Sequence, residues 1–236
     1  SIYYYYSVNL VGKTAEILGK NEIAKEYLNL SEEIRKAIVE EYYTTTGRLA
    51  LKNQTAYVLS LFFDIAPQYK ERTVKDLVER LKADKNHLKT GFIGTPYICR
   101  VLSDNGYNEL AYTLLLNKGL PSWLYAVNMG ATTIWERWNS VMPDGKMNPQ
   151  GMNSLNHYAY GAIAEWMYRH MAGINETAPG FKKAVIRPQV DWRIGSTNCY
   201  LDTASGKYES LWKITKDGAI LIEISTPFDT ETKIIL

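Results

Sequence analysis

Residues 21–43, NEIAKEYLNLSEEIRKAIVEEYY, decide the fold class of this chain. Apolar side chains recur there at spacings of three and four, at Ile23, Tyr27, Leu30, Ile34, Ile38 and Tyr42. Glutamate and lysine fill most of the positions between them, so one face is apolar and the other is solvated. The segment therefore predicts an amphipathic helix. Gly19, just before it, predicts the end of an earlier helix, VNLVGKTAEILGK.

Further pairs of helices follow the same pattern. QTAYVLSLFFDIA and KERTVKDLVERLKAD form one predicted pair around Pro67, and TPYICRVLSDNGY and NELAYTLLLNKG form the next. A long helix from about Ser154 to Ala172 is expected to close the series and to end at Gly173. No repeat of fixed period is visible, which disfavours a solenoid. Paired helices with long loops fit an α/α toroid, whose loops meet at a cleft, and a plain helical bundle is the alternative.

The pattern changes after Pro179, where FKKAVIRPQV and YESLWKITKDGAILIEISTPF read as strands. Apolar and polar residues alternate on both sides of a turn at 216–218, with apolar side chains at Tyr208, Trp212, Ile214, Ile220, Ile222 and Ile224. A hairpin is rarely stable alone, so this one is expected to pack on the helices or on further strands. We therefore expect a mainly α chain, with a toroid domain in residues 1–174 and a C-terminal β-sandwich in residues 175–236. Both domains are expected to be incomplete, because the chain starts in a predicted helix and stops in a predicted strand.

Composition restricts the class of partner. The chain has 236 residues, of which 46% are apolar, and a formal net charge of +2 from 27 basic and 25 acidic residues without a basic run. This balance argues against nucleic acid or an anionic membrane as the principal partner. The 18 tyrosines and 6 tryptophans, against 5 phenylalanines, suit a wet, aromatic-lined cleft or a core with hydrogen-bonded edges.

Metal and redox chemistry have no visible motif in the sequence. Cys99 and Cys199 lie far apart and match no ligand or redox spacing, and no HExxH segment occurs. No apolar stretch is long enough to span a bilayer. We therefore expect no metal, no cofactor and no membrane partner, and no feature assigns an oligomeric state or a compartment.

Two loops carry the polar and aromatic residues from which a site could be built. The first, KGLPSWLYAVNMGATTIWERW, places Glu136 between Trp135 and Trp138, and the second, MNSLNHYAYGAIAEW, contains His157. A carboxylate among indoles is poorly solvated, which tends to raise its pKa. One interpretation is structural, with Arg137 and other donors satisfying the charge. The other is glycosidic chemistry, because sugars stack on indole rings and this chemistry needs a poised carboxylate.

Several segments together resemble the bacterial α-L-rhamnosidases of glycoside hydrolase family 78. They are TGFIGTPYICRVLSDNGYNELAY, PSW, GATTIWERW, NSLNHYAYGAIAEWMYRHMAGI and PGFKKAVIRP, in this order and spacing. The resemblance covers nearly the whole chain and is densest from Thr90 to Pro188. It implies a six-hairpin α/α toroid followed by a β-sandwich. It also implies an inverting hydrolase that acts on terminal α-L-rhamnosyl groups of plant glycosides or bacterial polysaccharides, so that the expected partner is a rhamnose-containing carbohydrate.

The resemblance assigns roles to individual residues. The glutamate of the TTxWE motif, here Glu136, is the expected general base, and the histidine of the NHxxxG motif, here His157, is expected to contact the sugar. Trp123, Tyr125 and Trp138 are candidate sugar platforms, with loop packing as the alternative for each.

The second carboxyl of the mechanism has no counterpart in this chain. Inversion needs an acid about 6.5–9.5 Å from the base, and the family carries it in an Asp/Glu-rich segment upstream of the matching region. We therefore expect a fragment that holds the base without the acid and has little activity alone. Two rival functions stay open: a non-catalytic carbohydrate-binding fragment, and another inverting toroid glycosidase acting on glucosides or uronides.

Overall fold

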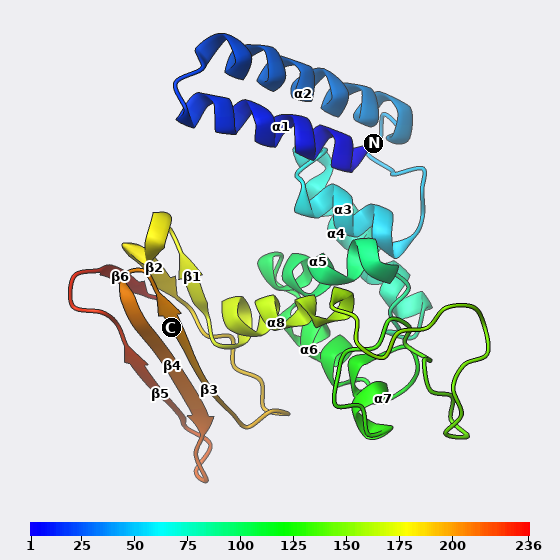
Figure 1. Ribbon diagram of the computed structural model, residues 1–236, viewed down its shortest axis with the longest axis vertical. Helices are drawn as coiled ribbons and strands as arrows, with labels where there is room; N and C mark the ends of the chain where they lie inside the picture. Colours follow the sequence, from blue (N-terminus) through cyan, green and yellow to red (C-terminus); the bar gives the residue numbers. More distant parts are fainter. The chain divides into compact units, whose positions relative to one another are not determined.

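The computed structural model describes residues 1–236, and they divide into two compact units, Ser1–Val101 and Leu102–Leu236 (Figure 1). The chain is mainly helical with a C-terminal β part, which confirms the predicted fold class. No helix in it has both the length and the apolar character needed to cross a membrane.

The first unit is built from helix pairs. Helices α1 (Ile2–Ile17) and α2 (Asn21–Tyr42) form an antiparallel hairpin, and α3 (Gln54–Phe62) packs with α4 (Lys70–Ala83) (Figure 1). Helix α5 (Gly91–Asp104) follows. The predicted helix over residues 21–43 is confirmed within one residue at its end. Gly19 adopts a φ of +69° where α1 ends, as the predicted helix stop requires.

A buried carboxylate fixes the turn after α4. The Asp84 side chain accepts hydrogen bonds from Arg80 Nε (2.7 Å), Lys89 Nζ (2.7 Å) and Gln54 Nε2 (2.9 Å). The hydrogen bond from Arg80 is the main cause that holds the pKa of the Asp84 carboxyl well below its usual range. Asp84 therefore ties the end of α4 to the start of α3.

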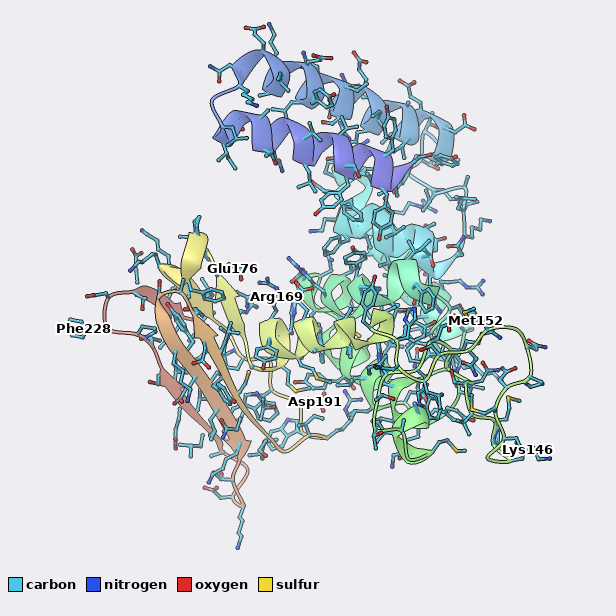
Figure 2. The ribbon with its side chains drawn as sticks, viewed as in Figure 1. Lys146, Met152, Arg169, Glu176, Asp191 and Phe228 are labelled. Carbon is cyan, nitrogen blue, oxygen red and sulfur yellow. The ribbon has the colours of Figure 1, made fainter.

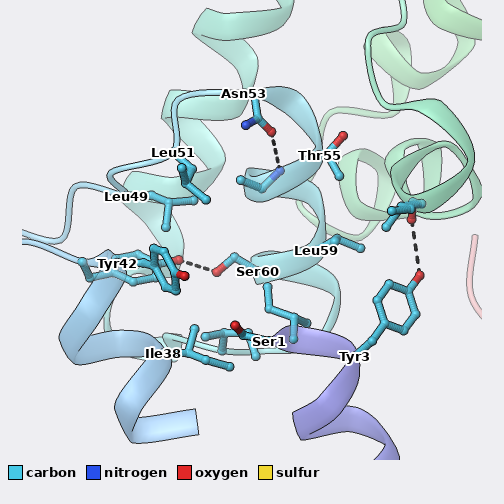
Figure 3. Close-up of a pocket in the computed structure, with 15 residues that line it drawn as sticks. Ser1, Tyr3, Ile38, Tyr42, Leu49, Leu51, Asn53, Thr55, Leu59 and Ser60 are labelled. Carbon is cyan, nitrogen blue, oxygen red and sulfur yellow. Dashed lines mark hydrogen bonds between the residues drawn. The ribbon is translucent and has the colours of Figure 1, made fainter. Parts of the chain in front are cut away.

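The first unit also contains a cavity of about 380 Å³ (Figure 3). Apolar side chains such as Ile38, Leu59 and Ile65 line it, and the Tyr43 hydroxyl shares a hydrogen bond with Ser60 at its wall. None of the predicted site residues lies in this cavity.

The helices of the second unit differ from the prediction in two places. The segment predicted to be a long loop before the last helix contains a short helix, α7 (Trp123–Asn128). Its start is fixed because Ser122 Oγ accepts a hydrogen bond from Tyr125 N (3.1 Å). Helix α6 (Asn108–Leu116) lies where it was predicted.

The predicted start of the last helix at Ser154 is wrong. The helical segment begins five residues later, as η2 (Ala159–Ala162), and continues through α8 (Ile163–Trp166) into a π-helical turn, η3 (Met167–Met171). The physical reason is competition for backbone groups. Residues 154–157 direct their peptide groups to another loop, so they cannot form the first helical turn.

Two three-stranded sheets form the C-terminal part. Strands β1 (Ile174–Glu176), β2 (Lys183–Ile186) and β6 (Glu231–Ile234) make the first sheet, in which β2 and β6 run parallel. Strands β3 (Ser196–Thr203), β4 (Gly206–Ile214) and β5 (Ile220–Ser225) make an antiparallel meander. A core of Ile174, Ala184 and Ile186 from the first sheet, Tyr208 from the second and Ala172 from the end of the last helix joins them. The predicted hairpin around residues 216–218 is confirmed, whereas β1 and β3 were not predicted.

Strand β4 is anchored to the end of the last helix. Trp212 is fully buried and its Nε1 donates to the Met171 carbonyl (2.7 Å), while Ser210 Oγ donates to the Ala172 carbonyl (2.7 Å). Gly173 makes the turn between helix and sheet with a φ of +81°. A Cβ there would stand 2.2 Å from the Arg187 carbonyl carbon, so only glycine fits.

Charged pairs hold the segments on either side of this junction. Arg169 pairs through two hydrogen bonds with Glu176 (2.7 and 3.0 Å), and Figure 2 shows these two side chains. In the segment that connects β2 to β3, Arg193 pairs with Asp191 and also donates to Thr113 Oγ1 (2.7 Å) on α6. These bonds fix the connecting segment 187–195 against the helices of the same unit. The predicted division at residue 174 follows secondary structure and stays a prediction.

Candidate functional site

Two loop segments of the second unit, residues 133–136 and 154–157, pair like short strands. Glu136 N donates to the Ser154 carbonyl (2.9 Å), and His157 N donates to the Ile134 carbonyl (2.8 Å). The Thr133 hydroxyl adds a bond to the Leu155 carbonyl. The pairing brings the segments of Glu136 and His157, which are about 20 positions apart in sequence, side by side.

The Glu136 carboxylate is half-buried and held by one backbone donor. Its Oε2 accepts a hydrogen bond from Ser154 N (2.7 Å), a charge-assisted bond to a fixed amide. Its Oε1 has no hydrogen-bond partner within the protein. The arrangement orients the carboxylate and leaves one oxygen able to accept a proton from an incoming molecule.

His157 lies two residues before the last helix. Its Nδ1 accepts a hydrogen bond from Ala159 N (3.3 Å), so the imidazole helps to cap the start of η2. Its ring lies parallel to that of the exposed Tyr158, with ring centroids 5.6 Å apart. The hydrogen bond from Ala159 N makes Nδ1 an acceptor and orients the imidazole ring.

A clamp that sequence reasoning missed closes the paired segments. Ser140 is fully buried, and its Oγ donates to Asn153 Oδ1 (2.6 Å), while Asn153 Nδ2 donates to the Ser140 carbonyl (3.1 Å). The same Oγ accepts a bond from Arg137 N (3.2 Å). Asn153 was visible as a polar loop residue, but nothing in the sequence indicated Ser140 as its partner.

The candidate aromatic platforms are packed against one another. Trp138 stacks on Tyr160 at a centroid distance of 3.8 Å, and Trp123 meets Trp138 edge to face at 5.4 Å. Trp123 Nε1 donates to the Tyr160 carbonyl (2.8 Å), and Trp123 is only 7% exposed. Burial also raises the pKa of the Tyr160 hydroxyl. These contacts favour packing as the main role of Trp123, while Trp138 is half-buried.

Tyr125 is likewise engaged within the protein. It is buried on α7, and its hydroxyl donates to the Val141 carbonyl (2.8 Å). The structure therefore does not bring Tyr125 to the carboxylate of Glu136 through any hydrogen bond, and its role as a sugar contact stays a prediction.

A cavity of about 340 Å³ lies beside the paired segments. Trp123, Trp135, Trp138 and Tyr160 line it, but Glu136, His157 and Tyr125 do not. The two predicted tryptophans thus share a hollow that the carboxylate does not enter.

Metal-binding chemistry has no counterpart among the described side chains. No group of three or more His, Cys, Asp or Glu residues is placed to hold a metal ion in residues 1–236.

Comparison with known proteins identifies the family. Residues 1–171 match the family model described as the bacterial α-L-rhamnosidase six-hairpin glycosidase domain, and residues 173–236 match that of the bacterial α-L-rhamnosidase C-terminal domain. The chain belongs to the bacterial α-L-rhamnosidase family.

Individual members of the rhamnosidase family are similar to this chain in sequence and structure over almost its whole length. An α-L-rhamnosidase from Alteromonas sp. (strain LOR) is 41% identical over 232 residues, which is 97% of this chain and 25% of that protein. The crystal structure of Streptomyces avermitilis α-L-rhamnosidase complexed with L-rhamnose superposes with a TM-score of 0.92 at 36% identity, covering 99% of this chain and 22% of that one. The Aspergillus terreus α-L-rhamnosidase gives a TM-score of 0.94 at 28% identity, covering 100% and 28%. The chain therefore spans about a quarter of the length of these rhamnosidases.

Proposed function

We propose that this chain carries the general base of an inverting glycoside hydrolase that releases terminal α-L-rhamnose. The observation that supports this most is the state of Glu136. One carboxylate oxygen is fixed by Ser154 N, and the other has no partner in the protein. A base of this kind needs both orientation and an open oxygen.

The proposed chemistry follows from that geometry. Glu136 Oε1 accepts a proton from a water molecule as the water oxygen attacks the anomeric carbon of the rhamnosyl group. The bond from that carbon to the leaving oxygen breaks on the opposite face of the ring, and a general acid protonates the leaving oxygen. The products are β-L-rhamnose and the free alcohol.

His157 is proposed to bind the sugar beside this base. The support for this is the pairing of its segment with that of Glu136, in which His157 N donates to the Ile134 carbonyl (2.8 Å). Trp138 and, more weakly, Trp123 and Tyr125 are proposed to shape the loops around the sugar. The relative from Streptomyces avermitilis was crystallised with L-rhamnose, which supports rhamnose as the sugar.

The general acid is proposed to lie outside these 236 residues. No segment of the chain resembles the Asp/Glu-rich motif that carries the acid in the family, and the chain spans 25% of its Alteromonas relative. The isolated chain is therefore expected to bind rhamnose weakly and to hydrolyse little.

The test compares Glu136→Gln with native protein in a longer rhamnosidase that contains this sequence. Glutamine keeps the acceptor for Ser154 N but cannot take a proton, so kcat for an aryl α-L-rhamnoside should fall about 10²–10⁴-fold while KM changes little. Glu223→Gln, an exposed site on β5, is the matched control and should leave kcat unchanged. A Glu136→Gln enzyme within threefold of native activity would remove Glu136 from the mechanism.

The isolated chain provides the second arm of the same assay. Turnover by this chain at a rate comparable to that of the longer protein would show that the acid lies within these residues. Release of glucose or a uronic acid by the longer protein, with no rhamnose, would instead establish the rival toroid glycosidase.

A further inference from the structure

The cavity beside the paired loops has the size and lining of a ligand site. Its volume of about 340 Å³ falls in the range of small-molecule pockets, which run from about 300 to 1,000 Å³ and are mostly apolar. Helix α7, segment 131–138 and the last helix contribute its walls. At its rim, Val127 is 59% exposed, so the cavity opens to solvent.

The cavity is separate from the Glu136 carboxylate. Trp135 and Arg137 line it, but the residue between them does not. Glu136 instead bonds with Ser154 on the paired loop. A molecule in the cavity would therefore lie against segment 131–138 without touching the proposed base.

Arg137 is the one charged side chain in the lining, and it is half-buried. Its guanidinium has no hydrogen bond or salt bridge within the protein, and its Nη2 lies 3.3 Å from the position that a Cβ on Gly151 would take. A partly desolvated cation without a carboxylate is poorly stabilised. An anion that pairs with both terminal nitrogens would complete its hydrogen bonding.

The remaining lining selects the rest of the ligand. Three indoles and the Tyr160 ring dominate the wall, with Thr132 and Thr133 as the only uncharged polar side chains outside these aromatics. The Thr133 hydroxyl already donates to the Leu155 carbonyl. Few groups are thus left to bind the several hydroxyls of a sugar, whereas an aromatic ring needs none.

We propose that this cavity binds a small aromatic acid, with its ring among the indoles and its carboxylate on Arg137. The site goes beyond the hydrolase function: it shares Trp123 and Trp138 with the loops proposed to surround the sugar, but neither Glu136 nor His157 lines it.

The test is calorimetric titration of this chain with 1-naphthoate and with the neutral 1-naphthalenemethanol. The two probes share a ring system and differ in charge, so native protein should bind the acid at least about tenfold more tightly, as hydrogen bonds to charged groups imply. Arg137→Met should lower the affinity for the acid to that for the alcohol. Arg137→Lys should restore part of the difference.

A second pair of variants separates this cavity from other apolar surfaces. Val127→Trp adds an indole at the exposed rim and should abolish binding of both probes. Val11→Trp, at a valine on α1 that is 45% exposed, is the matched control and should bind like native protein. Far-UV circular dichroism identifies any variant that fails to fold. If Arg137→Met fails to fold, the comparison of native protein with Arg137→Lys tests the role of the guanidinium.

Three results would overturn the proposal. They are equal affinity of native protein for the acid and the alcohol, unchanged binding by Val127→Trp, and binding of D-glucuronate as tight as that of 1-naphthoate. The last result would replace the aromatic acid by a sugar acid as the ligand class.

Discussion

Trp212→Phe should destabilise the second unit strongly. Trp212 is fully buried and its indole nitrogen donates to the Met171 carbonyl, at the junction of helix and sheet. Phenylalanine keeps an aromatic ring but leaves that carbonyl without its donor, which costs about 1–3 kcal/mol. The smaller ring also leaves a void of roughly 40 Å³, which costs about 1 kcal/mol. The expected loss in the free energy of unfolding is about 2–4 kcal/mol.

Urea unfolding monitored by tryptophan fluorescence measures this loss selectively. All six tryptophans lie in the unit Leu102–Leu236, so their emission reports that unit. With a urea dependence near 3 kcal/mol per M, the midpoint should fall by about 1 M.

Trp192→Phe is the matched control for this experiment. Trp192 is 64% exposed, so its replacement should change the free energy of unfolding by no more than about 0.5 kcal/mol. If Trp212→Phe unfolds at the same urea concentration as Trp192→Phe, the hydrogen bond to the helix end does not hold the sheet, and the reasoning fails.

Three further predictions concern buried contacts. Asp84→Ala should lower the free energy of unfolding by roughly 1–3 kcal/mol at pH 7 in thermal melts, because the buried Gln54 amide loses one of its two acceptors while the more exposed Arg80 and Lys89 are partly solvated. Asp229→Ala, at an exposed position, should be neutral. The pKa of Asp84 in the folded state lies below its ordinary value of 3.8, so its contribution to the free energy of unfolding is present above pH 3.8 and is lost as the pH falls through the lowered pKa. If Asp84→Ala stayed as much less stable than native protein in strong acid as it is at pH 7, this reasoning would be contradicted. Gly173→Ala should lower the free energy of unfolding by more than roughly 4 kcal/mol, because its Cβ would clash with backbone atoms. Gly195→Ala, at a similar φ but with no atom near the added Cβ, should lower it by only about 1–2 kcal/mol. Equal losses of the two variants in urea unfolding would refute the steric argument. Asn153→Ala should reduce rhamnoside hydrolysis by the longer protein at unchanged far-UV circular dichroism, since it releases the paired loops; native kcat would show that the clamp is dispensable.

Most of the helices were predictable, because their apolar spacing is a local property of the sequence. Spacing alone placed α2 within one residue, and the alternation around Trp212 identified the β4–β5 hairpin. The strand β3, STNCYLDT, was missed because its residues are mostly polar and it is held by cross-strand bonds to β4. Local sequence patterns were therefore sufficient to predict most of the secondary structure.

The candidate site was predictable only as residue identities. The family resemblance pointed to Glu136 and His157, and the structure pairs their segments. The amide that holds the carboxylate belongs to Ser154, 18 positions away, which no local pattern indicates. The same long-range pairing removed residues 154–158 from the predicted helix. The burial of Trp123 was equally invisible, since exposed and packed indoles look alike in sequence.

The most direct test of Glu136 as the base is chemical rescue of Glu136→Gly in the longer rhamnosidase. Removing the carboxylate leaves room beside the anomeric carbon, and azide can attack there without a base to deprotonate it. The account predicts that millimolar azide raises the rate of aryl α-L-rhamnoside cleavage at least about tenfold and that nuclear magnetic resonance identifies β-L-rhamnosyl azide as the product. Formation of α-L-rhamnosyl azide, or a rate that azide leaves unchanged, would contradict the assignment of Glu136 as the general base of an inverting enzyme.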